Sequence, residues 1–109
     1  MAAMQRKELL AALSQSWRRK LADFRFRPVK HGMSGAQIFC LRGGPASALA
    51  QTLYLKAFPP DALSEFRGEI ERTRWLSTRN VRVPEILDVF DDGRLGVALI
   101  TALPGSRPR

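Results

Sequence analysis

The 109-residue sequence has little of what builds covalently cross-linked or metal-bound proteins. A single cysteine, Cys40, excludes an internal disulfide and any zinc site that needs several cysteines. There is one histidine, His31, and no apolar run approaches the roughly 18 to 20 residues that a membrane span needs. The charged N-terminal residues also lack the compact apolar region of a secretory signal. We therefore expect a cytoplasmic protein that has no membrane partner.

Negative charge is scarce at the N-terminal end of the chain, although the formal net charge is +8. Residues 1–30 hold eight basic and two acidic side chains, whereas residues 31–109 hold ten and eight. No helix-turn-helix, zinc-finger or aromatic RNA-binding motif accompanies this charge. The basic composition alone does not indicate a nucleic acid partner, and we expect none.

Apolar spacing predicts two helices. In residues 8–21, five apolar side chains recur every three or four positions, which is typical of a helix with one buried face. A second helix is expected after Pro60, with Asp61 as its N-terminal cap and Asn80 at its end. Its core-facing side chains are Leu63, Phe66, Ile70 and Leu76, and Trp75 is also assigned to the core.

Alternating apolar and polar residues predict five strands around these helices. Residues 24–29 form the first strand, and Pro28 favours an edge position for it. Residues 35–44 and 48–58 supply the next two, and an Asp92-Gly93 turn joins the last two. The order predicts an α+β unit, a five-stranded antiparallel sheet with one crossover helix and an N-terminal helix. Cys40, within an apolar run, is expected to be an inert buried thiol.

Lys56 places a positive charge inside a mostly apolar strand. Because an unpaired buried ammonium is costly, this lysine needs an anionic partner. Glu69 lies near the edge of the core-facing stripe of the second helix and can reach the sheet, whereas Glu71 lies on the solvated side. A surface lysine on an edge strand would give the same pattern, so spacing alone leaves both interpretations open.

Five segments in register resemble the N-terminal lobe of the aminoglycoside 3'-phosphotransferases, antibiotic-resistance enzymes with a protein-kinase-like fold. The segments are GMSGAQIFCL, LYLK, EIERTRWL, VPEIL and LITALPG, and the resemblance runs from about Arg25 to Gly105. It implies an N-terminal helix in residues 1–23, a nucleotide-binding lobe in residues 24–103 and a linker or truncated tail in residues 104–109. ATP is the implied nucleotide, and an aminoglycoside hydroxyl is the implied acceptor.

The resemblance also implies a set of nucleotide-binding residues. A glycine-containing turn faces the phosphates, a lysine held by a glutamate binds them, and apolar, aromatic and linker positions contact the adenine. Within this set Ser34 faces the β-phosphate, Tyr54 stacks on the adenine, and Lys56 is the phosphate-binding lysine. The whole set is Met33, Ser34, Gly35, Ile38, Tyr54, Lys56, Glu69, Thr101 and Leu103.

The catalytic motif of that family, H-G-D…N, does not occur in the 109 residues, and neither does its later metal-binding aspartate. We therefore assign no catalytic or metal-binding residue, and we expect the Mg²⁺ ligands in an absent C-terminal lobe. The chain alone is expected to bind ATP weakly and to transfer no phosphate. Two alternatives are a non-catalytic nucleotide-binding or interaction domain and the N-terminal lobe of a related kinase for a sugar or small alcohol.

Overall fold

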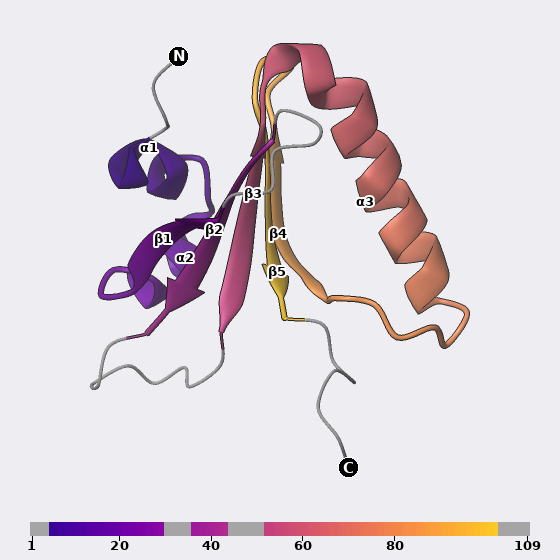
Figure 1. Ribbon diagram of the computed structural model, residues 1–109, viewed down its shortest axis with the longest axis horizontal. Helices are drawn as coiled ribbons and strands as arrows, with labels where there is room; N and C mark the ends of the chain where they lie inside the picture. The colour runs from indigo at the N-terminus through magenta and orange to yellow at the C-terminus, as the bar shows by residue number, and fades with distance from the viewer. Residues whose placement is uncertain (1–4, 30–35, 44–51, 103–109) are drawn as a thin grey trace.

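A five-stranded antiparallel sheet organises the described part of the chain (Figure 1). The computed structural model describes residues 5–29, 36–43 and 52–102. The strands lie in the order β1-β2-β3-β5-β4, so β3 is central while β1 and β4 form the edges. The predicted α+β architecture is confirmed. The strands are β1 (Arg25–Val29), β2 (Gln37–Arg42), β3 (Leu53–Phe58), β4 (Ile86–Asp91) and β5 (Gly96–Thr101).

Helices cover both faces of this sheet (Figure 1). Two short helices, α1 (Arg6–Ala11) and α2 (Gln15–Lys20), lie on one face. The crossover from β3 to β4 passes through a 3₁₀ turn, η1 (Pro60–Ala62), into α3 (Leu63–Ser77) on the other face. Side chains on successive strand residues point to opposite faces, so each central strand contributes to two apolar layers.

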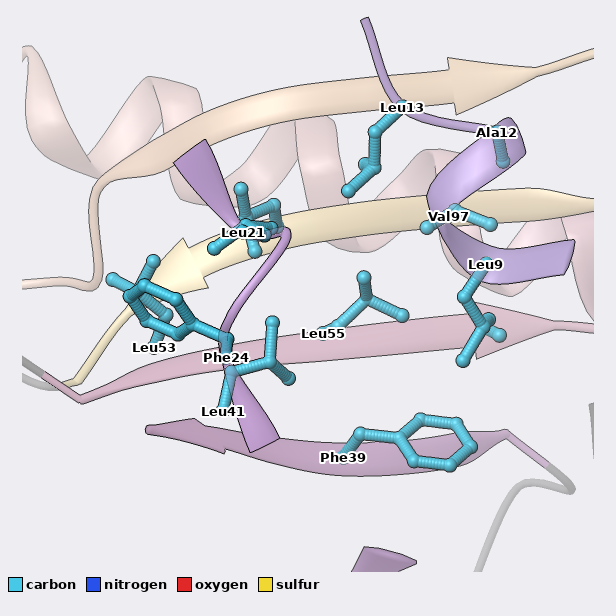
Figure 2. Close-up of a cluster of buried hydrophobic side chains, with 12 residues drawn as sticks. Leu9, Ala12, Leu13, Leu21, Phe24, Phe39, Leu41, Leu53, Leu55 and Val97 are labelled. Atoms are coloured by element: carbon cyan, nitrogen blue, oxygen red, sulfur yellow. The ribbon is translucent and has the colours of Figure 1, made fainter. Parts of the chain in front are cut away.

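The larger apolar layer lies between the sheet and the N-terminal helices (Figure 2). Full burial of one leucine contributes roughly 1.5–3 kcal/mol, so this layer is the main source of stability. The smaller layer beneath α3 centres on Phe58 and Phe66, whose ring centroids are 5.1 Å apart. The buried residues of the larger layer are Leu9, Ala12, Leu13, Leu21, Phe24, Phe39, Leu41, Leu53, Leu55, Ala57, Val97 and Leu99.

The single helix predicted over residues 8–21 is wrong, because α1 and α2 are separated by a break. Along one straight helix, Leu9 and Leu21 would point about 120° apart, and one of them would leave the core. The break lets both become fully buried. It also exposes the backbone N–H of Ser14, which donates a hydrogen bond of 2.8 Å to Oδ2 of Asp88 on β4.

The two ends of α3 differ in how well the sequence predicts them. Asp61 lies within η1 and makes no cap, since the N-cap position is Ala62 and has no side-chain hydrogen bond. At the other end α3 stops at Ser77, and Asn80, predicted near the helix end, adopts a left-handed conformation with φ of 62° in the turn that follows. Just beyond it, the N–H of Val81 donates to the carbonyl of Leu76 at 3.2 Å.

Two predictions about burial are wrong. Trp75 is 55% exposed, because it lies nine residues after Phe66 and therefore about half a turn away from the sheet. Cys40 is only half-buried on β2, where it pairs with Arg27 on one side and Tyr54 on the other. Neither residue belongs to the apolar layers.

The Asp92-Gly93 turn between β4 and β5 is confirmed. Gly93 has φ of 86°, which glycine adopts at little cost. Oδ1 of Asp92 accepts the N–H groups of Arg94 and Leu95, both at 2.9 Å, and these hydrogen bonds hold the pKa of Asp92 below its usual range.

The two edge strands carry features that interrupt regular pairing. Pro28 on β1 has no N–H group to offer a further strand, as predicted for an edge position. On β4 the register with β5 shifts between Ile86 and Asp88, which marks a bulge. Within the described ranges no helix is long and apolar enough to cross a membrane.

Candidate functional site

An ion pair joins the centre of the sheet to α3. Nζ of Lys56 lies 2.6 Å from Oε2 of Glu69. The two side chains are 27% and 35% exposed, so the pair lies at the edge of the apolar layer and remains open to solvent. The predicted pairing of Lys56 with Glu69 is confirmed, and the alternative of an edge-strand lysine is wrong because β3 is central.

Helix geometry explains why Glu69 and not its neighbour makes this contact. Glu69 follows Phe66 by three residues, so both side chains lie on nearly the same side of α3. Phe66 is buried against the sheet and thereby directs Glu69 toward β3. Glu71 is exposed, as predicted.

The sheet register places two other predicted residues on the same face as Lys56. Ile38 on β2 is directly opposite Lys56, and Tyr54 precedes Lys56 by two residues on β3. Both side chains are half-buried. The structure thus brings together one apolar, one aromatic and one cationic side chain on the face that also carries α3.

Sequence reasoning did not single out the β5 residues of this face. Ala98 is opposite Lys56, and Ile100 is opposite Tyr54. The alternating pattern of LITALPG and the residues before it predicts that Ala98 and Ile100 lie on a strand. It does not show which strand they pair with.

A small cavity of about 100 Å³ adjoins the ion pair between α3 and the sheet. Pockets that hold a whole small molecule measure roughly 300–1,000 Å³, so a nucleotide does not fit inside it. A larger hollow of about 360 Å³ lies against the other side of α3 and is not lined by Lys56. The small cavity is lined by Lys56, Phe58, Phe66, Glu69, Ile70, Thr73, Pro84, Ile86, Ala98 and Ile100.

Thr101, at the end of β5, is held from both its backbone and its side chain. Its N–H donates to the carbonyl of Glu85 at 3.0 Å, and its Oγ1 accepts the N–H of Glu85 at 2.9 Å. These two hydrogen bonds fix where the chain leaves the sheet. The other predicted linker residue, Leu103, and the predicted phosphate-facing turn, Met33, Ser34 and Gly35, lie outside the described residues.

A second ion pair holds α3 from its other side. Nε and Nη2 of Arg67 donate to the two carboxylate oxygens of Asp91 at 2.6 and 3.0 Å. This hydrogen bonding, aided by the N–H of Gly93, lowers the pKa of Asp91 to about 2. Asp91 also raises the pKa of Arg67. Among the described residues, no group of three or more His, Cys, Asp or Glu side chains could hold a metal ion.

A five-stranded antiparallel sheet, with a central-strand lysine paired to a glutamate of the crossover helix, defines a kinase-like N-terminal lobe. Comparison with known proteins agrees. An aminoglycoside 3'-phosphotransferase of Streptomyces fradiae is 30% identical in a 91-residue alignment that covers 81% of this chain and 33% of that protein. No protein-family model matches the chain.

A solved structure is similar in both fold and sequence. Aminoglycoside phosphotransferase APH(3'')-Id from Streptomyces rimosus matches with a TM-score of 0.61 and 26% identity, over 92% of this chain and 32% of that one. The chain thus spans about one third of the length of each protein. The predicted resemblance to the N-terminal lobe of the aminoglycoside 3'-phosphotransferase family is confirmed.

Proposed function

We propose that the chain is the ATP-binding lobe of an aminoglycoside phosphotransferase that transfers a phosphoryl group to an antibiotic hydroxyl. The observation that carries the proposal is the 2.6 Å contact between Lys56 and Glu69 on the shared face of β3 and α3. The names of both relatives support the acceptor class.

The ion pair prepares Lys56 to bind an anion. An ammonium group has three hydrogen-bond donors, and Glu69 takes one of them. The other two can reach phosphate oxygens, because the lysine side chain is 27% exposed. Glu69 also restricts the flexible side chain before the nucleotide binds, which lowers the entropic cost of binding.

The same face offers a surface for the adenine. Tyr54 supplies an aromatic ring for stacking, and Ile38 supplies an apolar contact beside it. The N–H of Thr101 is already bonded to Glu85, so a backbone contact from Thr101 to the adenine must come from its carbonyl. The turn containing Ser34 is proposed to face the β-phosphate, as in the family that the sequence resembles.

We assign this lobe a binding role and not the chemical step. Phosphoryl transfer also needs a residue that orients the acceptor hydroxyl and ligands for Mg²⁺. The described residues do not fit a metal site, and Glu69 is paired to Lys56. Their contribution is therefore to hold ATP and to balance its phosphate charge. We propose that the 109-residue chain alone does not phosphorylate an aminoglycoside.

Titration with ATP and AMP tests the proposal. Replacing Lys56 with alanine should weaken ATP binding about tenfold or more, the usual effect of losing a charged hydrogen bond. AMP binding should change less, because it lacks the distal phosphates. Lys7→Ala is the matched control, since it removes the same charge from an exposed position on α1 and should leave ATP affinity unchanged.

Equal loss of ATP affinity in both variants would indicate a general charge effect and contradict the site. Absence of ATP binding by the folded wild-type chain would contradict the function. An assay with kanamycin and ATP tests whether this chain binds ATP without catalysing transfer. If the wild-type chain phosphorylates kanamycin and Lys56→Ala abolishes this activity, the chain is catalytic by itself.

A further inference from the structure

Two residues of α3 have no structural explanation within the described chain. Gly68 lies in the helix interior, where glycine is less favourable than alanine. A Cβ atom at this position would meet nothing within 4 Å. Trp75 is 55% exposed, although large aromatic side chains are usually buried in a core or an interface. One residue leaves a gap where there is room for a side chain, and the other presents an apolar ring to solvent.

These two residues lie on the same side of α3. They are seven positions apart, and a helix returns to nearly the same direction after seven residues. Phe66 marks the opposite side, which is buried against the sheet. Figure 1 shows no described helix or strand beyond the outer side of α3. The gap at Gly68 and the ring of Trp75 thus form one uncovered helix face.

We propose that this face pairs with the same face of a second copy of the chain, with the two α3 helices antiparallel. In this arrangement Trp75 of each copy packs over Gly68 of the other. The absence of a side chain at Gly68 lets the ring approach the helix backbone. A two-fold axis makes the contact twice, as in other isologous dimers. The inference does not depend on nucleotide binding.

The charges between these two residues fit an antiparallel pair. Glu71 and Arg72 lie midway between Gly68 and Trp75, so the two-fold axis passes beside them. Glu71 of each copy then faces Arg72 of the other. Both side chains are exposed, and neither forms an ion pair with another described residue. A parallel pair would instead place like charges together and Trp75 against Trp75, so the sequence favours the antiparallel arrangement.

Arg79 orders the ring that would make the contact. Its guanidinium carbon lies 4.8 Å from the centroid of the Trp75 ring. This cation–π contact covers one face of the ring and limits its rotation. The other face is then available to the backbone around Gly68 of a second copy, and less side-chain freedom is lost on association.

One helix pair forms a small interface, so the association should be weak. We expect a dissociation constant of roughly 10 µM to 1 mM for this contact. Sedimentation velocity of the wild-type chain across this concentration range should show a reversible monomer–dimer equilibrium.

Charge reversal gives the sharpest test. Glu71→Arg places two positive charges opposite two positive charges, and Arg72→Glu does the same with negative charges. Each variant alone should associate at least about tenfold more weakly than wild type, since both symmetric contacts become repulsive. An equimolar mixture should associate again, because one variant then complements the other. Asp23→Arg changes the net charge as Glu71→Arg does, away from α3, and should dimerise like wild type.

Gly68→Leu tests the packing separately from charge. It fills the gap that the ring of Trp75 occupies, so dimerisation should be lost while the thermal midpoint does not fall, because leucine favours helix. A wild-type chain that stays monomeric at 1 mM would overturn the proposal. Single charge variants that dimerise normally, or a mixture that stays monomeric, would overturn the antiparallel α3 pair.

Discussion

The ring of Phe66 packs directly on the backbone of Gly96. A Cβ atom placed on Gly96 would lie 2.6 Å from Cδ2 of that ring, closer than two non-bonded carbon atoms can approach. Phe66 is the buried anchor of α3, and Gly96 is the first residue of β5. The distance between α3 and the sheet, and therefore the reach of Glu69 to Lys56, depends on the absence of a side chain at Gly96.

Gly96→Ala should therefore destabilise the fold by about 1–3 kcal/mol, the usual cost of overpacking a core. Urea unfolding monitored by circular dichroism measures the change. Gly68→Ala is the matched control, because it adds the same methyl group to open space in a helix and should stabilise the chain by up to about 1 kcal/mol. A neutral Gly96→Ala would show that Phe66 moves aside at no cost.

Glu69→Gln should separate stability from nucleotide binding. The ion pair is partly exposed, and such pairs contribute about 1 kcal/mol or less, so the free energy of unfolding should change little. ATP affinity should fall severalfold, because Lys56 is no longer held by a charged partner. Calorimetric titration and urea unfolding of the same samples check both expectations. A large loss of stability with unchanged affinity would mean that the pair serves the fold only.

Acid should weaken the tether between Arg67 and Asp91. The hydrogen bond from Arg67, followed by that from Gly93, lowers the pKa of Asp91 from 3.8 to about 2. Because the folded pKa lies below the unfolded one, the stabilisation is present above about pH 4 and is lost as the pH falls toward 2. Urea unfolding of wild type and Asp91→Asn at several pH values should give free energies of unfolding that differ most near neutral pH and become similar near pH 2. A constant difference would contradict this assignment.

Asp88→Ala should loosen the N-terminal helices. Oδ2 of Asp88 accepts the N–H of Ser14 at the break between α1 and α2. Loss of this hydrogen bond should cost about 1 kcal/mol and speed amide exchange at Ser14. Hydrogen exchange followed by NMR measures the second effect. Asp23→Ala, which removes an exposed carboxylate beyond α2, should leave the exchange rate unchanged.

Local sequence patterns predicted the elements of this fold because the determinants are local. Alternation defined the strands, and Asp92 with Gly93 defined the hairpin. Glu69 could be placed because three residues separate it from a core-facing phenylalanine. Long-range contacts were harder to foresee. The N–H of Ser14 at the helix break is bonded to Asp88, far along the chain, and the pairing of Ile100 with Tyr54 depends on the strand order.

Two of the failed predictions, those for Trp75 and Asp61, have one physical cause in common. Trp75 and Asp61 were assigned by residue type, the first as apolar core and the second as a helix cap. In the structure, the position of Trp75 around the helix axis directs its side chain away from the sheet, so it is exposed. A 3₁₀ turn places the start of α3 after Asp61, so this residue cannot cap the helix. The outer face of α3 became visible only once the direction of Trp75 was known.

Pro28 and the bulge before Asp88 also determine whether copies of this chain can pair through their sheet edges. An open sheet edge is a template for fibril growth, because its free backbone groups pair with another strand. On β1 the missing N–H of Pro28 and the charges of Arg25 and Arg27 oppose such growth. On β4 the irregular register and Asp88 have the same effect. A concentrated solution of this small basic chain is therefore expected to resist amyloid formation. Contacts between copies should then form through the helices and not through the sheet edges.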